Sequence, residues 1–564
     1  MEDKIKKYFP FEKFRPKQRE SIEAIIKTYQ TKPYFVLEAP TGIGKSGIAY
    51  CVSQFAINDV VYKNKPEGPP VIICTSTRML QKQYSDTFKD VKTLWSSRHY
   101  DCPLDPGSAN EDEEPTNYGS LMCPKNKCTY FKICPYLIAK TKFMKSKIGV
   151  LNYHFFLSKE DLNPNLLICD EAHNLENILC EIMALEITSF SVERIYKNLR
   201  KFEYITKDEE EVKLLVDEIL NIKDIKPLSK DLDILEALIE ELDHICMEIS
   251  ERIEEIKEFV DEYGSQVPKK IRKEGAVLEK IYNDCIRLSA KINYFLNSKV
   301  EWVIAVKDEK HIKFKPLSIT DISRNFLNRS TNLLFMSSTI CGATQFCKEL
   351  GIDDNSTYDY LSLPSIFPKE NRMIYSINLG VLNYKNQEEL LPKFIENIDV
   401  LIQKMIDGKG PIRGLIHSVS YKNAEKILKL SKFKDRMLIP NSYEVMNIND
   451  ILSEAEDIIL VSPRITEGVD LHDDLSRFQF FPKVPYPYLG DAWIKGKLER
   501  DPDWYSRETI IKLVQGAGRS VRSEEDWAYT FILDSNFRRL VTINRNMFPT
   551  WFIESVKFIN VNSV

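Results

Sequence analysis

The stretch YFVLEAPTGIGKSGIAY, residues 34–50, passes from an apolar run through a glycine-containing turn into a helical pattern. Such a turn directs backbone N–H groups and a helix N-terminus at one point, which suits a phosphate group. Lys45 is expected to reach the β- and γ-phosphates of a nucleotide, and Ser46 to offer its hydroxyl to Mg²⁺. Gly42 and Gly44 keep the turn flexible, although alanine stands at the first glycine position of the general pattern. The stretch predicts a P-loop that binds ATP with Mg²⁺; a plain glycine-rich turn is the alternative.

A second apolar run ends in two acids, in the stretch NLLICDEAH at residues 165–173. A P-loop needs a further carboxylate for its metal, ideally at the end of another strand of the same sheet. Asp170 is expected to hold Mg²⁺ through water, and Glu171 to polarise the attacking water. His173 has no partner ligand at i+4, so we expect it to couple two sites rather than bind a metal. The pair predicts hydrolysis; two surface acids after a strand are the alternative.

The stretch QGAGRSVR, residues 515–522, carries two arginines and an amide at helical spacing. On a helix, Gln515, Arg519 and Arg522 would recur at i, i+4 and i+7 and face a common target. Phosphoryl transfer is accelerated by arginines supplied across an interface. Alone, the stretch is typical of a solvated basic face, but beside the other two motifs it predicts an arginine-finger helix.

Short apolar runs recur along the chain, each followed by a turn and then by helical periodicity. They are continuous rather than alternating, which is typical of strands covered on both faces in a parallel sheet. With 564 residues, the chain is too long for one core, so we expect an α/β protein with two parallel sheets. Two stretches, 100–147 and the mainly helical 187–300, break the rhythm and are interpreted as insertions into the first domain. The expected limits are 1–99, 148–186 and 301–345 for the first domain and 346–564 for the second.

The first insertion contains a cluster of cysteines in CPKNKCTYFKIC, residues 123–134, with one more upstream. The set is Cys102, Cys123, Cys128 and Cys134. Four cysteines can hold either Zn²⁺ or an iron–sulfur cluster. Structural zinc favours two close pairs of ligands, whereas three cysteines crowd together here and one is distant, which fits a cubane cluster better. The other cysteines sit mainly in apolar runs and are expected to be core thiols.

Charge and hydropathy argue against a membrane role and limit where nucleic acid can bind. No apolar run approaches the ~20 residues that span a bilayer, and the N-terminus lacks a secretory signal, so a cytoplasmic location is expected. The formal net charge is −5, so any nucleic-acid surface must be local. Residues 125–147 contain seven lysines and no acid, interleaved with Tyr130, Phe131, Tyr136 and Phe143. Such a surface suits a single strand; a solvated helix with core aromatics is the alternative.

Taken together, these motifs resemble the superfamily-2 helicases of the XPD and DinG group. The resemblance covers nearly the whole chain, and the motifs occur in the same order. The group's motifs Q, Ia, II, III, IV, V and VI are similar to FRPKQ (14–18), TSTRMLQKQ (75–83), DEAH (170–173), MSST (336–339), GLIHSVSYKNAEKIL (414–428), RITEGVDL (464–471) and QGAGRSVR (515–522).

The resemblance implies a fold and cofactors. The fold is two RecA-like domains, with an iron–sulfur domain and a helical arch inserted in the first. The cysteine spacing resembles that of the DinG branch, and this resemblance implies a [4Fe–4S] cluster in the first insertion. The nucleotide contacts that it implies are Gln18 to adenine, Thr41, Gly42, Gly44, Lys45 and Ser46 in the P-loop, and Glu467, Gly468 and Asp470 in the motif V stretch.

The resemblance also implies an activity. It is ATP-dependent movement 5′ to 3′ on single-stranded DNA, with forked duplex split at the first insertion and the arch closing over the DNA channel. A monomer is expected. The alternative is an ATP-gated clamp or protein-displacing module that hydrolyses ATP without separating strands. The lysines expected to influence DNA affinity are Lys140, Lys142, Lys145 and Lys147.

Overall fold

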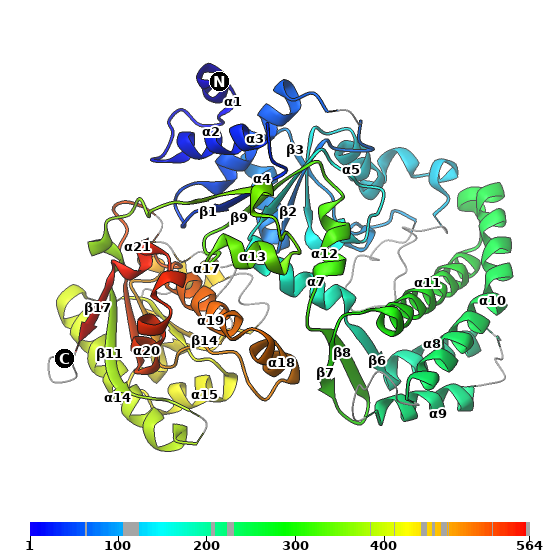
Figure 1. Cartoon of the computed structure of the whole chain (residues 1–564). Coiled ribbons are helices and arrows are strands. Elements are labelled where there is room, and N and C mark those ends of the chain that lie inside the picture. Colours follow the sequence, from blue (N-terminus) through cyan, green and yellow to red (C-terminus); the bar gives the residue numbers. More distant parts are fainter. Residues whose placement is uncertain are drawn as a thin grey trace.

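Two α/β domains lie side by side in the computed structural model, and a helical arm extends from the first of them (Figure 1). The structure describes residues 1–559 except 63–64, 105–122, 203, 205–208, 223–230, 384, 411, 442–447, 454–456, 464–470, 472 and 522. Within this described part of the chain, no helix combines the length and apolar character needed to cross a membrane.

The first domain is built on a seven-stranded parallel sheet. Its strands are β1 (Tyr34–Glu38), β2 (Val71–Thr75), β3 (Val91–Thr93), β4 (Ile148–Asn152), β5 (Leu166–Asp170), β9 (Asn332–Ser337) and β10 (Tyr358–Ser362), in the order β10-β1-β9-β5-β2-β4-β3. Every residue of β2, β5 and β9 is buried, which explains their continuous apolar character. Strand β10 pairs in parallel with β1, so the first sheet extends beyond residue 345.

The apolar runs predicted a second parallel sheet, and the second domain contains one, with seven strands. Its strands are β11 (Ile374–Gly380), β12 (Gly414–His417), β13 (Met437–Leu438), β14 (Ile459–Ser462), β15 (Phe478–Phe481), β16 (Tyr529–Asp534) and β17 (Val556–Ile559), in the order β13-β14-β12-β15-β16-β11-β17. Strands β12 and β15 are neighbours, so the residues that follow them emerge at the same edge of the sheet.

Helices pack on both faces of the first sheet and form two separate hydrophobic clusters with it. The helices of the first domain are α1 (Glu2–Tyr8), α2 (Gln18–Thr28), α3 (Lys45–Asp59), α4 (Arg78–Thr87), α5 (Pro135–Met144), α6 (Tyr153–Leu157), α7 (Leu175–Met183), α12 (Thr320–Leu327) and α13 (Ala343–Glu349). Those of the second are α14 (Gln387–Lys409), α15 (Tyr421–Leu430), α17 (Ile448–Ser453), α18 (Ala492–Arg500), α19 (Pro502–Ala517), α20 (Asn536–Ile543) and α21 (Thr550–Ile553).

The arm is the predicted helical insertion, and it has a hydrophobic core of its own. It comprises α8 (Ser189–Lys201), α9 (Glu209–Leu220), α10 (Asp231–Tyr263) and α11 (Lys269–Asn297). A three-stranded antiparallel sheet joins it to the first domain: β6 (Leu185–Thr188), β7 (Trp302–Lys307) and β8 (His311–Pro316). Strands β7 and β8 form a hairpin between the arm and the strand that carries the MSST stretch.

Candidate nucleotide site and cysteine insertion

The P-loop turn lies between β1 and α3, as predicted, and it requires its glycines. Gly42 and Gly44 adopt φ values of +87° and +81°, in the left-handed region that disfavours larger residues. A Cβ on Gly44 would lie 2.4 Å from Nε2 of Gln18, and one on Gly42 would lie 2.0 Å from the Phe367 ring. The Lys45 ammonium donates to the carbonyl oxygen of Ala39 at 3.1 Å. The turn is therefore tightly packed and holds Lys45 close to its own backbone.

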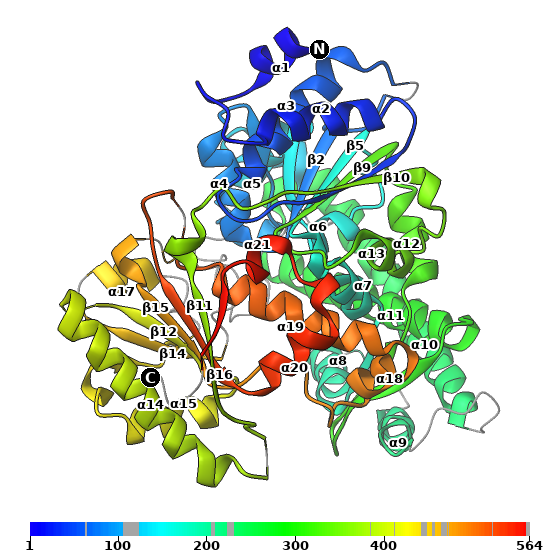
Figure 2. The same ribbon diagram turned by 60° about the vertical axis from the view of Figure 1, so that its left-hand side comes forward.

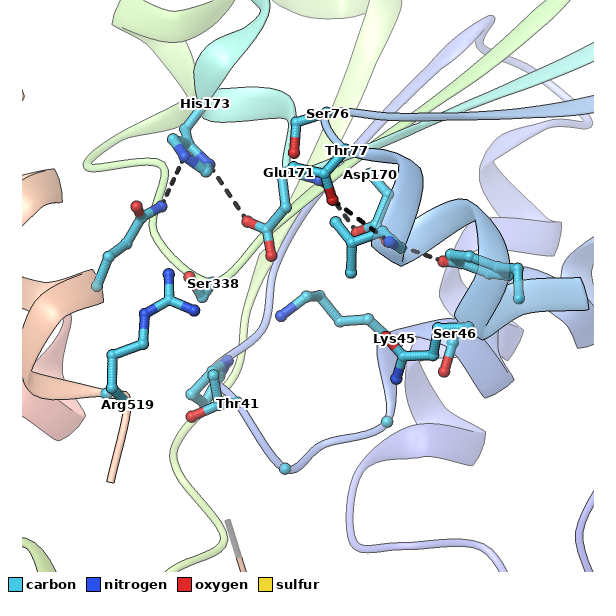
Figure 3. Close-up of a pocket in the computed structure, with 18 of the residues that line it drawn as sticks. Thr41, Lys45, Ser46, Ser76, Thr77, Asp170, Glu171, His173, Ser338 and Arg519 are labelled. Atoms are coloured by element: carbon cyan, nitrogen blue, oxygen red, sulfur yellow. Dashed lines mark hydrogen bonds and ion pairs between the residues drawn. The ribbon is translucent and has the colours of Figure 1, made fainter. Parts of the chain in front are cut away.

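A cavity of about 600 Å³ opens in front of this turn and is lined by both domains (Figure 3). The predicted residues that line it are Gln18, Thr41, Gly42, Gly44, Lys45, Ser46, Asp170, Glu171, Gln515 and Arg519. The structure thus brings together motifs that are up to 501 positions apart, from Gln18 to Arg519. The predicted site residues Glu467, Gly468, Asp470 and Arg522 lie outside the described residues.

Gln18 reaches the P-loop from the start of α2. Its side-chain oxygen accepts from the backbone N–H of Arg15 at 2.7 Å, and its amide nitrogen donates to the carbonyl of Gly44 at 3.3 Å. The Arg15 guanidinium donates to the carbonyl of Gly42. These bonds fix the position of the Q-motif stretch at one end of the cavity.

Asp170 is the last residue of β5 and Glu171 follows it, but the two acids occupy different surroundings. Asp170 is buried; its carboxylate accepts from the Tyr84 hydroxyl at 2.9 Å and from the Glu171 backbone N–H at 3.1 Å. Burial, helped by the Glu171 charge, raises the pKa of Asp170 to about 6, while Lys45 and Tyr84 act in the opposite direction. Glu171 has φ +53°, and its carboxylate faces the cavity (Figure 3). Sequence reasoning did not find Tyr84.

His173 connects several of the predicted motifs, consistent with the expected coupling role. Its Nδ1 lies 2.8 Å from the Ser337 hydroxyl in the MSST stretch and 3.4 Å from a carboxylate oxygen of Glu171. Its Nε2 lies 2.7 Å from Nε2 of Gln515, on the second domain. If the Gln515 amide donates to Nε2, the ring proton is on Nδ1 and faces Ser337 and Glu171. The ring therefore links the acid pair, the first sheet and the second domain.

Arg519 points into the cavity from the second domain, but not from a helix (Figure 3). Helix α19 ends at Ala517, and Gly518 forms its C-terminal cap. The expectation of one helical face carrying residues 515, 519 and 522 is therefore wrong for Arg519. Glycines at 516 and 518 weaken the helix and allow it to end there.

The end of α19 is held by residues of β12 and β15. Gln479 donates to the carbonyl of Ala517 at 3.0 Å, and its side-chain oxygen lies 3.1 Å from Nε2 of His417. The His417 ring stacks on Phe481 with centroids 4.0 Å apart and planes 12° apart. Burial lowers the pKa of His417 to about 4, and the charge of Arg519 acts in the same direction. A neutral histidine thus supports the segment that carries Arg519.

The four predicted cysteine ligands are half-buried, in contrast to the other eight cysteines, which are all buried as expected. Burial raises the pKa of the Tyr136 hydroxyl, with smaller contributions from Tyr100, Cys123 and Cys134. Four sulfur donors suit iron or zinc chemically. Among the residues that the structure describes, however, three or more potential ligands do not converge on one point. The metal site therefore stays a prediction.

The lysine-rich segment is exposed, but its aromatic residues divide into two kinds. Lys140, Lys142, Lys145 and Lys147 are all exposed. Tyr130 and Phe131 are 37% and 40% exposed, whereas Phe143 is fully buried in the core of the first domain. Phe143 is therefore a packing residue, and only the exposed rings are available for base stacking. The segment also reaches the arm: the Lys127 ammonium donates to the carbonyl of Glu262 at 3.2 Å.

Residues 411–555 match the family described as helicase C-terminal domain, and residues 72–192 match the DEAD_2 family. An ATP-dependent DNA helicase CHL1 of Saccharomyces cerevisiae is 22% identical over 476 residues, which are 72% of this chain and 55% of that protein. An ATP-dependent DNA helicase XPD of Sulfolobus acidocaldarius is 20% identical over 576 residues, covering 94% of this chain and 97% of that protein. The chain thus spans little more than half of the CHL1 protein but nearly all of the XPD protein.

Solved structures give the same picture of the fold. A structure of an XPD helicase has a TM-score of 0.62 at 16% identity and covers 98% of this chain and 100% of that chain. Xpd4 of S. tokodaii has a TM-score of 0.58 at 14% identity and covers 97% and 100%. Fold, motif order and family matches agree, and together they support a superfamily-2 helicase of the XPD and DinG type.

Proposed function

We propose that this protein is an ATP-dependent DNA helicase that moves 5′ to 3′ on single-stranded DNA and unwinds forked duplex. One observation carries the proposal: a single cavity between two RecA-like domains collects Lys45, Asp170, Glu171 and Arg519. Such a cavity couples nucleotide hydrolysis to domain movement because each domain supplies part of the charge stabilisation. The named activities of CHL1 and XPD support the same assignment.

Each residue of the cavity has its own proposed role in hydrolysis. Lys45 grips the β- and γ-phosphates, with the backbone of Thr41, Gly42 and Gly44 around them. Glu171 orients and polarises the attacking water, and its left-handed backbone keeps the carboxylate in the cavity. Arg519 stabilises charge that develops on the transferred phosphoryl group. Gln18 is the proposed adenine contact, held ready by its bonds to Arg15 and Gly44.

Mg²⁺ fits the donor set on the first domain. Ser46 and the buried Asp170 carboxylate both line the cavity, and oxygen ligands of this kind suit the ion. When bound, Mg²⁺ would neutralise phosphate charge. The Tyr84 hydroxyl supports the charged form of Asp170, because its hydrogen bond opposes the effect of burial on the pKa.

Coupling to DNA is assigned to His173 and Gln515. Their contact crosses between the domains, and the same ring lies beside Glu171. A movement of the second domain therefore changes the surroundings of the water-activating acid. We propose a groove over both domains as the path of the single strand, with the exposed lysines of the first insertion on it.

The insertion at 100–147 is proposed to carry a [4Fe–4S] cluster on Cys102, Cys123, Cys128 and Cys134. Two observations support it: the four sulfur donors and their half-buried state. No step of hydrolysis depends on the cluster. Iron and acid-labile sulfide in anaerobically purified protein, near four of each per chain, are the expected result. Zinc without iron would overturn the assignment.

Replacement of the P-loop lysine tests the proposed function. Lys45→Ala should abolish DNA-stimulated ATP hydrolysis while leaving the melting temperature and the circular dichroism spectrum unchanged. The lysine donates to a backbone carbonyl of its own loop, so its loss should not disturb the fold. A variant that retained full DNA-stimulated turnover would refute the central assignment.

A further inference from the structure

A buried cluster of charges joins α7 and α13 of the first domain to α18 and α19 of the second. Lys497 of α18 forms an ion pair with Glu176 of α7, and their side chains are only 7% and 8% exposed. The indole N–H of Trp504, in the first turn of α19, donates to the other oxygen of Glu176 at 2.9 Å. Both carboxylate oxygens of Glu176 are therefore bound by groups of the second domain.

A second ion pair lies next to the first. Arg507 of α19 pairs with Glu349 of α13, with side-chain exposures of 5% and 13%. Burial and the Glu176 charge raise the pKa of Glu349, while Arg507 and Lys497 lower it. The Gln345 amide also donates to Asp501 at 2.5 Å. Two helices of each domain thus meet in one polar cluster.

Helices α18 and α19 of the second domain also pack against the hydrophobic core of the first domain. Trp493 and Trp504 belong to the hydrophobic cluster that contains Leu175 and Leu179 of α7. The Trp493 indole donates to the carbonyl of Pro316 at 2.9 Å, at the base of the arm. Figure 2 shows α18 and α19 reaching from the second domain toward α7 and the arm.

The position of the cluster along the helices relates it to the nucleotide cavity. Glu176 is three residues beyond His173, and Arg507 is eight residues before Gln515 on α19, which is about 12 Å along a helix. Helix α19 thus meets the α7 segment at two points: Trp504 binds Glu176 on α7, and Gln515 contacts His173 in the short 3₁₀ turn Ala172–Asn174 that precedes α7. Holding the helices together at Glu176 therefore limits where Gln515 can lie relative to His173.

Stability alone does not account for such a cluster. Burying charges costs desolvation energy, and apolar residues of similar volume often give equal or greater stability. Paired charges do restrict the geometry, because each needs its partner at hydrogen-bonding distance. We propose that Glu176 and Lys497 are positioning residues that hold α19 against α7, so that Gln515 meets His173 and Arg519 enters the cavity. The proposal rests on the proposed ATP hydrolysis at that cavity.

The test uses three variants of the full chain: Glu176→Gln, Lys497→Met and the double variant. In each, kcat for DNA-stimulated ATP hydrolysis should fall roughly tenfold or more, because small displacements of catalytic groups carry large rate penalties. KM for ATP should stay the same, since the P-loop belongs to the first domain. The double variant leaves no unpaired charge, so its melting temperature should exceed that of Lys497→Met while its kcat stays low.

The matched control is Lys495→Met, on the same helix. Lys495 pairs with Glu499 at 3.8 Å, and both side chains are about two-thirds exposed (66% and 67%). Its kcat and melting temperature should equal those of the unmodified protein. A double variant with restored stability and unchanged kcat would overturn the proposal, because the cluster would then serve folding alone.

Hydrogen exchange provides a readout that does not depend on hydrolysis. Amides at the end of α19, around Gln515, should exchange faster in Lys497→Met than in Lys495→Met, with P-loop amides unchanged. Equal exchange in the two variants would overturn the proposal. Unmodified protein that fails to hydrolyse ATP would instead refute the proposed function, and the exchange result would still decide whether the cluster fixes α19.

Discussion

Gln515 and His173 lie in contact across the two domains, with their Nε2 atoms 2.7 Å apart. The other ring nitrogen of His173 lies beside Glu171, so the histidine ring connects Gln515 to the acid that faces the nucleotide cavity. Gln515→Ala should therefore lower DNA-stimulated kcat about tenfold, a loss equivalent to ~1.4 kcal/mol, while nucleotide binding stays unchanged. Steady-state kinetics and titration with a fluorescent ATP analogue measure the two effects.

A control for this variant lies one turn earlier on the same helix. Lys512 does not line the cavity, so Lys512→Ala should retain the full stimulation by DNA. If Gln515→Ala behaved like Lys512→Ala, the contact would have no part in coupling.

Tyr84 is expected to affect the metal requirement rather than the affinity for ATP. Its hydroxyl donates to Asp170 and stabilises the charged carboxylate. Tyr84→Phe removes that donor with little change of volume, so the Mg²⁺ concentration for half-maximal hydrolysis should rise about tenfold, as for a hydrogen bond of ~1.5 kcal/mol to a charged group. Hydrolysis measured across a Mg²⁺ titration tests this. An unchanged titration curve would exclude a role for Tyr84 in supporting Asp170.

His417 is expected to make stability depend on pH. Its pKa falls from 6.5 to about 4 on folding, mainly because the ring is buried. The folded state therefore disfavours the proton: the stabilisation is complete above pH 6.5 and is lost as the pH falls toward 4. The contribution amounts to at most about 3 kcal/mol.

His417→Gln keeps a donor near Gln479 but removes the titration. Raised pKa values, such as that of Glu349, act in the opposite direction, so the comparison must be between the two proteins at each pH. Urea unfolding between pH 7 and pH 4.5 should show a steeper loss of stability in the unmodified protein. Parallel curves would show that His417 does not titrate in this range.

The lysine-rich segment should contribute to DNA affinity through charge. Replacing Lys140, Lys142, Lys145 and Lys147 together by glutamate should weaken binding of single-stranded DNA at least tenfold at physiological salt, and should flatten the dependence of affinity on salt. Fluorescence anisotropy with a labelled oligonucleotide measures both. Unchanged affinity would remove this segment from the DNA path.

In the matched control, four lysines on the second domain are replaced by glutamate. Lys393, Lys404, Lys422 and Lys429 are exposed on α14 and α15. Both variants change the net charge by the same amount, so a specific effect appears only if the first variant binds more weakly than the second.

Features of the fold and the site that lie within one continuous segment could be predicted from the sequence. The P-loop, the acids that end β5 and the alternation of apolar runs with helices are all local, and the structure contains each of them. The helical insertion was predictable for the same reason, because a long apolar periodicity identifies it.

Contacts between distant segments could not be predicted in this way. Tyr84 and Asp170 are 86 positions apart, and Glu176 and Lys497 are 321 apart, so no local pattern joins them. The placement of Arg519 was missed because helical spacing continues through the stretch, whereas the helix itself ends at Ala517. Phe143 looked equivalent to Tyr130, but the fold buries one ring and exposes the other.

Strand displacement tests the account most directly. Anaerobically purified protein is given ATP, Mg²⁺ and matched duplexes with either a 5′ or a 3′ single-stranded tail, and Lys45→Ala is the inactive control. We expect displacement from the 5′-tailed duplex only, and none by Lys45→Ala. Hydrolysis stimulated by single strands without displacement from either duplex would contradict the proposed helicase function, and would instead identify an ATP-gated clamp or remodelling module.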